Sequence, residues 1–325
     1  MTVSPRIEFA KTTGTVPARF ENKDGIHFVT AFGGQVSALD ALMGWMDPHV
    51  QVDTARERFG TLSPSDSRKL GYQSMVGAKQ IAEYVAMTAL GLDAELVLGD
   101  IVIEELVCDD TPTAGSACTL LDVGETIVAF DGVPTPTLAE LAELMKGRRI
   151  GDVVTLSVIP YVAGAEDKDP KKAEERNVTL MADPDQPDRP IIGFVPADTR
   201  TVKLPFEANI STEGIGGPSA GLAFTIALLD ELTDGNLVGK GRVAATGTIS
   251  EDGSVGAIGA LEQKSIAVRD AGATLFLVPA GQSDDEMAKA RTAAGSRVKI
   301  VQVATLDEAL AALRKNGGVA LPAPR

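Results

Sequence analysis

The chain has 325 residues, which suggests two or three domains at the usual domain size. Apolar residues make up 44% of it and aromatic residues only 4%, so we expect mainly aliphatic cores. The formal net charge of −15 argues against nucleic acid or an anionic membrane surface as the main partner, because both attract basic patches.

Residues 1–97 predict an α/β segment whose role stays open. The N-terminus, Met1–Pro5, lacks a basic region followed by an apolar run, so no signal peptide is expected. The expected elements are a strand at Phe28–Phe32, a short amphipathic helix at Ala38–Met46 that stops near Asp47–Pro48, and a longer helix from Ser65 to about Leu90 that Gly91 ends.

Residues 98–183 are rich in short runs typical of strands. The expected elements are strands at Ile101–Ile103, Thr126–Phe130 and Val153–Ile159, a turn at Asp131-Gly132, and a helix at Thr137–Lys146. Residues 163–176 are highly charged and are expected to form a solvated loop. The polar, proline-rich residues 184–190 predict a linker to the next domain.

Cys108 and Cys118 are the two cysteines of the chain. They are too few for a disulfide framework, and no partners follow at the spacing of a zinc site. We expect two ordinary buried thiols; the alternative is a single disulfide, which requires an oxidising compartment. No metal and no cofactor is predicted.

Residues 191–317 alternate between strand and helix, which predicts an α/β domain. Strands are expected at 191–195, 201–208, 243–249, 274–278 and 298–303, and helices at 218–232, 260–271, 283–294 and 306–315. Residues 318–325 are expected to form a flexible tail. The whole chain is therefore expected to have a mixed α/β, multidomain fold. It has no run of about 18 apolar residues, so no membrane span is predicted and the chain as written is expected to be soluble.

A candidate nucleophile, Ser219, lies directly before a predicted helix. The N–H groups at a helix start have no acceptors within the helix, so those of the turn at 218–220 could stabilise an oxyanion, with Gly217, Pro218 and Ala220 as oxyanion or supporting residues. Gly216 and Gly221 would let a substrate backbone approach closely. The alternative is a structural serine that helps to cap the helix. A phosphate-binding loop is not predicted, since the nearest approach, Gly235–Gly241, has neither the spacing nor the Ser/Thr of that motif.

A serine nucleophile needs a base. His27 and His49 are the only histidines, and both lie in the N-terminal segment, where we expect them at the surface and away from Ser219. Lys264 shares the apolar face of its predicted helix with residues three and four positions away, all of them apolar. Desolvation there would lower its pKa and make it a usable base; the alternative is a lysine whose amine reaches back to solvent.

These residues resemble the proteolytic domain of Lon-type peptidases over about 191–313. The resemblance rests on Gly217–Gly221, Ala245–Ile249, Asp252–Gly259, Gln263-Lys264 and Ala271–Pro279. It implies that Ser219 is the nucleophile, that Lys264 is its general base, and that Thr246 hydrogen-bonds near the lysine. Gly216 stands where Lon enzymes proper usually have an acidic residue, which is similar to the branch without an ATPase. Ala260 replaces a glycine that is common at its position.

Residues 98–183 resemble a PDZ domain of bacterial type. The resemblance rests on Val123–Ile127, with Glu125 in place of the usual aspartate, and on Phe130–Pro134. PDZ domains bind peptide ends or extended segments by strand addition. We expect the groove within Leu96–Glu105, with Leu96, Val97 and Leu98 binding substrate.

The order of the three parts is similar to that of envelope-associated PDZ–Lon-like proteins of Gram-positive bacteria. The resemblance implies a cell-envelope or extracytoplasmic location, protein or peptide substrates, and membrane attachment through an N-terminal anchor, which this chain lacks and which could have been trimmed. Whether the chain forms a homo-oligomer stays open.

The sequence thus predicts an ATP-independent serine endopeptidase that acts on unfolded or extended proteins, with a PDZ domain for substrate recognition. Two alternatives remain. One is a non-catalytic scaffold that binds peptides through the PDZ groove, and the other is the peptidase subunit of an ATP-dependent complex with a separate ATPase.

Overall fold

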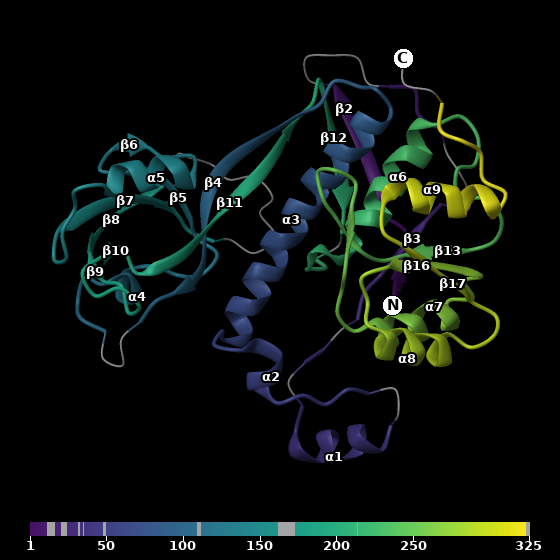
Figure 1. Ribbon diagram of the computed structural model, residues 1–325, viewed down its shortest axis with the longest axis horizontal. Coiled ribbons are helices and arrows are strands. Elements are labelled where there is room, and N and C mark those ends of the chain that lie inside the picture. Colours follow the sequence, from purple (N-terminus) through teal and green to yellow (C-terminus); the bar gives the residue numbers. More distant parts are fainter. Residues whose placement is uncertain are drawn as a thin grey trace. The chain divides into compact units, whose positions relative to one another are not determined.

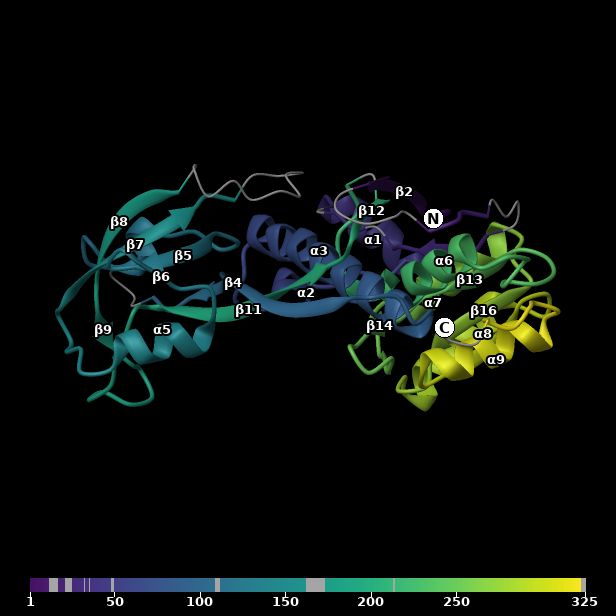
Figure 2. The same ribbon diagram turned by 90° about the horizontal axis from the view of Figure 1, so that it is seen from above.

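A computed structural model describes residues 1–11, 17–20, 25–31, 33–34, 36–47, 50–108, 112–161, 173–212 and 214–322 (Figures 1 and 2). The chain divides into two compact units, and each is built from segments that are separate in sequence. The first unit comprises Met1–Arg58, Ala78–Leu96 and Val202–Arg325, and the second comprises Phe59–Gly77 and Val97–Thr201.

A five-stranded sheet forms the centre of the first unit. Its strands, in spatial order, are β1 (Thr2–Val3), β3 (His27–Val29), β13 (Val243–Ala245), β16 (Leu275–Pro279) and β17 (Lys299–Val303). β3, β13, β16 and β17 are parallel, and β1 is antiparallel to β3. All five residues of β16 are buried, as expected for an apolar strand of a parallel sheet with both faces covered.

Helices follow the strands of this unit: α6 (Gly221–Leu232), α7 (Leu261–Asp270), α8 (Asp284–Ala294) and α9 (Leu306–Lys315). Local capping sets where they begin. Ser283 and Glu286 form a capping box at α8, and the Thr305 side chain accepts a hydrogen bond from the Glu308 N–H at α9. One core of the unit packs residues of the sheet against α7 and α8, among them Val29, Ala244, Val268, Phe276 and Met287.

The N-terminal residues belong structurally to the first unit. β3 lies in register beside β13, with His27 opposite Ala244, and β2 (Arg6–Lys11) pairs antiparallel with β12 (Phe206–Ser211). The sequence predicted a separate segment here because strand pairing over two hundred residues leaves no local signal. The prediction that His27 lies apart from the domain of Ser219 was therefore wrong, and His49 lies outside the described residues.

The remaining N-terminal elements are helices. The short α1 (Ala38–Met46) has the predicted bounds, and α2 (Ala55–Phe59) was not predicted. The long α3 (Pro64–Ala89) confirms the second predicted helix, and Gly91 follows it with a positive φ of 69°. Among the residues described, no helix is both long and apolar enough to cross a membrane.

The second unit is built on an antiparallel sheet. Its strands, in spatial order, are β11 (Phe194–Lys203), β4 (Glu95–Leu106), β5 (Thr126–Phe130), β7 (Val153–Ile159) and β8 (Glu174–Thr179), and β6 (Val133–Pro134) also pairs with β5. The helices are α4 (Ala117–Leu120) and α5 (Leu138–Met145). Thr137 and Glu140 form a capping box that starts α5, and the Leu141 side chain is buried in the aliphatic core together with Ile127 and Leu156.

Three predicted strands of residues 191–317 are interrupted in the structure. The strand predicted at 191–195 divides between β10 (Pro190–Ile191) and β11, with a break at residues 192–193. The strand predicted at 201–208 breaks after Lys203, before Pro205, whose fixed φ and missing N–H end a ladder. The strand predicted at 243–249 divides into β13 and β14 (Thr248–Ile249), which pairs with β15 (Val255–Gly256). Gly247 lies at this break with φ of 145°, a conformation that favours glycine.

Three predicted irregular segments also differ. Residues 174–176 of the predicted loop begin β8, whereas residues 162–172 lie outside the described part. The predicted linker 184–190 lies inside the second unit, where it connects β9 (Met181–Ala182) to its partner β10 (Pro190–Ile191). The first residues of the predicted flexible tail are held by the fold, because the Val319 N–H donates a hydrogen bond to Asn236 O at 2.9 Å.

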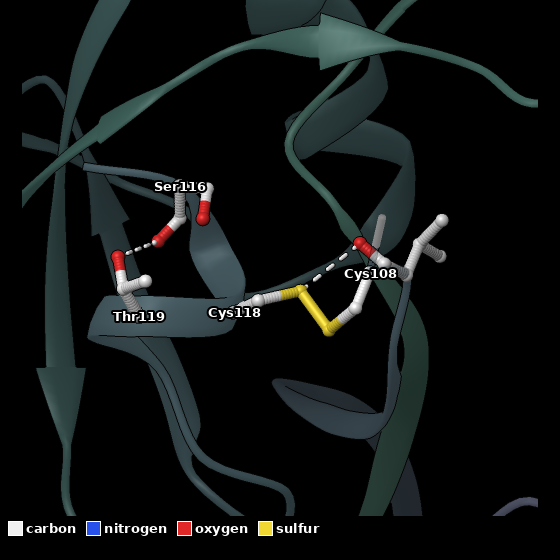
Figure 3. Close-up of a disulfide and its surroundings, with 5 residues drawn as sticks. Cys108, Ser116, Cys118 and Thr119 are labelled. Atoms are coloured by element: carbon white, nitrogen blue, oxygen red, sulfur yellow. Dashed lines mark hydrogen bonds between the residues drawn. A yellow bond between two sulfur atoms is a disulfide. The ribbon is translucent and has the colours of Figure 1, made fainter. Parts of the chain in front are cut away.

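Cys108 and Cys118 form a disulfide in the second unit (Figure 3). It joins the residues that follow β4 to α4. The Cα atoms of Cys108 and Cys118 lie 5.8 Å apart. The prediction of two free thiols was therefore wrong, because the sequence does not reveal that the two segments meet. The Thr119 hydroxyl donates to Ser116 O at 2.9 Å and supports the same short helix.

We expect the Cys108→Ser/Cys118→Ser double variant to lose about 3 kcal/mol of stability in the second unit, since the bond closes a loop of roughly ten residues. Urea unfolding with and without dithiothreitol measures this loss. The reductant should destabilise the wild type and leave the double variant unchanged; a wild type indifferent to reduction would contradict the prediction.

Candidate active site

A tight turn presents Ser219. Residues Pro218–Ala220 form a single 3₁₀ turn that leads directly into α6. Gly217 precedes it with φ of 100°, and Pro218 takes the first helical position, where a missing N–H has no cost. Gly221 packs so closely on Ile249 that an added Cβ would lie 2.9 Å from the Ile249 backbone nitrogen. Gly217 and Pro218 therefore suit the backbone conformation of the turn, and Gly221 suits its close packing against Ile249.

The backbone of Ser219 is held by the break between β13 and β14. The Gly247 N–H donates to Ser219 O at 2.8 Å, and the Thr246 hydroxyl donates to the same oxygen at 3.1 Å. The Leu222 N–H in turn donates to Gly247 O at 3.1 Å. The interruption of the predicted strand is thus what fixes the candidate nucleophile.

Lys264 reaches Ser219 from the first turns of α7. Its side chain is 4% exposed, and the Leu261 and Val268 side chains of the same helix are buried with it, as the apolar spacing indicated. Lys264 Nζ donates to Ser219 Oγ at 2.8 Å and to Thr246 Oγ1 at 3.2 Å. The structure therefore brings Ser219, Lys264 and Thr246 together.

Burial lowers the pKa of the Lys264 ammonium from 10.5 to about 8. Desolvation is the cause, because a charged amine loses its water there. A substantial fraction of Lys264 is consequently neutral near pH 8 and can accept a proton from the hydroxyl that it contacts.

The same burial has a cost in stability with a defined pH dependence. Because the pKa is about 8 in the folded state and 10.5 in the unfolded state, the unfolded chain binds more protons between these values, and the penalty is complete below about pH 8. It amounts to about 3 kcal/mol at most. Lys264→Met removes it, together with two hydrogen bonds of about 1 kcal/mol each.

We therefore expect Lys264→Met to be more stable than the wild type at pH 7 by about 1 kcal/mol, and the difference to shrink toward pH 10.5. Urea unfolding at several pH values measures it. Lys289→Met, which removes an exposed lysine paired with Asp285, is the matched control. A stability difference that is independent of pH would contradict the assigned burial.

The same turn offers two candidate oxyanion donors. Because the first hydrogen bond of the turn runs from the Gly221 N–H to Pro218 O, the N–H groups of Ser219 and Ala220 have no acceptor within it. Pro218 has no N–H and can act only through the conformation that it imposes. A candidate nucleophile, a candidate base and two N–H donors thus lie at or beside the start of α6, an arrangement suited to acyl transfer.

The remaining predicted site residues lie elsewhere. Gly216 is exposed just before the turn. Leu96, Val97 and Leu98 lie in β4, the strand between β11 and β5 in the sheet order. The edges of this sheet are β11 and β8, so the groove predicted on β4 does not coincide with an edge that could add a strand.

Comparison with known proteins identifies the part of the chain that carries this site. Residues 211–315 match the family described as the Lon protease (S16) C-terminal proteolytic domain. We refer to these residues, which are similar to that domain, as the Lon-type domain. The predicted resemblance is confirmed for these residues, which lie within a mixed α/β fold.

Two relatives of the Lon-type domain are Lon proteases. That of Campylobacter concisus is 35% identical over 94 residues, or 29% of this chain and 11% of the relative. That of Trichlorobacter lovleyi is 39% identical over 110 residues, or 34% of this chain and 13% of the relative. The chain thus spans only about a tenth of the length of the Lon proteases that it matches.

Among solved structures, the PDZ domain of the SdrC-like protein from Listeria monocytogenes is similar. The match has 25% sequence identity, covers 30% of this chain and 87% of that domain, and has a TM-score of 0.23.

Sequence reasoning missed the role of Gly247 in the Lon-type site and did not foresee the backbone conformation of Ala260. Gly247 binds the Ser219 backbone, and only its position after Thr246, where a strand was expected to continue, could have indicated the break. Ala260 adopts φ of 58° and ψ of 37° at the start of α7, a left-handed conformation that the glycine common there takes at lower cost. Its carbonyl accepts the hydrogen bond from the Lys264 N–H at 3.0 Å.

Proposed function

We propose that this protein is an ATP-independent serine endopeptidase that hydrolyses peptide bonds of unfolded or extended proteins. The observation that carries the proposal is the 2.8 Å hydrogen bond between Lys264 Nζ and Ser219 Oγ, in a site where burial brings the pKa of Lys264 to about 8. No histidine is needed in this arrangement, because the lysine supplies the base.

Acylation begins when the neutral Lys264 amine takes the proton of the Ser219 hydroxyl while Oγ attacks the scissile carbonyl carbon. The carbonyl oxygen becomes an oxyanion, which the N–H groups of Ser219 and Ala220 stabilise. The Lys264 ammonium then gives its proton to the leaving amine nitrogen as the C–N bond breaks. An ester on Ser219 remains.

Deacylation repeats these steps with water. Lys264, again neutral, takes a proton from a water molecule that attacks the ester carbonyl, and the proton passes to Ser219 Oγ as the ester breaks. Thr246 holds the Lys264 amine beside Ser219, because the Thr246 hydroxyl accepts a hydrogen bond from Lys264 Nζ and donates one to Ser219 O.

The second unit is proposed to select extended substrate segments by strand addition. β11 is an edge strand of its sheet, and a peptide can extend a sheet at its edge strand. β11 is also fixed to α5, because the Leu138 N–H donates to the Asp198 carboxylate at 2.7 Å. This assignment replaces the groove predicted on β4.

Cleavage of an unfolded protein tests the proposal. The wild-type chain is incubated with reduced, carboxymethylated protein, with and without ATP and Mg²⁺, and products are identified by mass spectrometry. We expect internal cleavage at equal rates in both conditions. Cleavage only with ATP and a cell extract would indicate a separate ATPase, and binding without products would indicate a scaffold.

A further inference from the structure

A buried glutamine joins two loops of the Lon-type domain next to the helix that carries Lys264. Gln282 lies between β16 and α8 and is 7% exposed. Its Oε1 accepts from the Ile258 N–H at 2.7 Å, and its Nε2 donates to Ile258 O at 3.0 Å. The amide thus satisfies both backbone groups of one residue, as a neighbouring strand would.

The residue that Gln282 holds is close to the start of α7. Ile258 is followed by Gly259 and by Ala260, whose left-handed conformation turns the chain into the helix. The Lys264 N–H donates to Ala260 O, so the first hydrogen-bonded turn of α7 begins two residues after Ile258. A shift of Ile258 would therefore be transmitted to the Lys264 backbone through two residues.

The backbone on both sides of Gln282 is held by hydrogen bonds. Ser283, the next residue, starts α8 through its capping box with Glu286, and the Ala280 N–H donates to Val303 O at 2.9 Å. Gln282 is thus fixed on both sides by the backbone of the domain. Its amide is the link from this framework to the loop before α7.

We propose that Gln282 is a positioning residue that sets the place of the Lys264 amine against Ser219 by holding Ile258. The proposal rests on the proposed function, since it assigns Lys264 as the base. The side-chain amide of Gln282 bonds to the backbone of Ile258, whereas the amine of Lys264 bonds to Ser219, so Gln282 has no chemical step of its own.

Gln282→Met tests the proposal, because methionine has nearly the same length and volume but makes neither hydrogen bond; Gln282→Ala is a second variant. We expect kcat on a peptide substrate to fall about 10- to 100-fold with KM little changed, since small displacements of catalytic groups have effects of this size. The midpoint of the pH–rate profile should also move from about 8 toward 10.5 as the amine becomes better solvated.

Asn316→Ala is the matched control. Asn316 lies in the same unit, and its Nδ2 likewise donates to two carbonyls, those of Val238 at 3.2 Å and Lys240 at 2.9 Å, both away from Ser219 and Lys264 in sequence. This variant should lose stability without a change in the pH profile. If Gln282→Met behaves in the same way, Gln282 is merely structural and the proposal is overturned.

Titration of Lys264 separates this inference from the proposed function. The ¹³Cε resonance of Lys264, assigned through Lys264→Met, reports its pKa in full-length protein without any turnover. A raised pKa in Gln282→Met supports the positioning role even if the wild type cleaves nothing. An unchanged pKa together with an unchanged kcat refutes it even if the wild type is an active peptidase.

Discussion

Ser219→Ala and Lys264→Met should each abolish peptide cleavage, lowering kcat by at least about a thousandfold. The reason is that the nucleophile and the base act in one step, so that neither is useful without the other. For the same reason the double variant should be no slower than either single variant. Initial rates on an internally quenched peptide, measured at pH 9, give the comparison.

Two controls identify a specific loss. Lys289→Met removes a lysine of the same unit from an exposed pair with Asp285 and should retain wild-type activity. A fluorophosphonate probe should label the wild type at Ser219, label Lys264→Met much more slowly, and leave Ser219→Ala unlabelled. Full activity in Ser219→Ala would refute Ser219 as the nucleophile. Full activity in Lys264→Met would refute Lys264 as the base.

The rate of cleavage should rise about 100-fold between pH 6 and pH 9, with its midpoint near pH 8. The base must be neutral to accept the serine proton, and burial sets the pKa of Lys264 at about 8. Only about 1% of the amine is neutral two pH units below that value, so kcat/KM should fall tenfold per pH unit on the acid side.

The pH profile also discriminates between bases. The profile is obtained by measuring kcat/KM between pH 5.5 and 10 on a peptide without titratable side chains. A midpoint near 6.5, the ordinary pKa of histidine, would contradict a lysine base. A midpoint near 10.5 would mean that the amine of Lys264 is solvated during the reaction, contrary to its burial in the structure.

The sequence by itself was sufficient for the features that depend on neighbouring residues. Helix starts are an example, since the side chains that cap α5 and α8 stand three residues from the glutamates that complete their capping boxes. The apolar spacing around Lys264 indicated its burial for the same reason. The glycine-rich turn before α6 likewise carried enough local information to nominate Ser219.

Tertiary structure decided the features that join distant residues. The pairing of β3 with β13, the meeting of Cys108 with Cys118, and the hold of Gln282 on Ile258 all depend on how loops close. Such contacts arise from the packing of the whole domain and leave no periodic pattern in the chain. The sequence could therefore nominate Ser219 and Lys264, but only the fold set Nζ at 2.8 Å from Oγ and removed the water that would keep the amine charged.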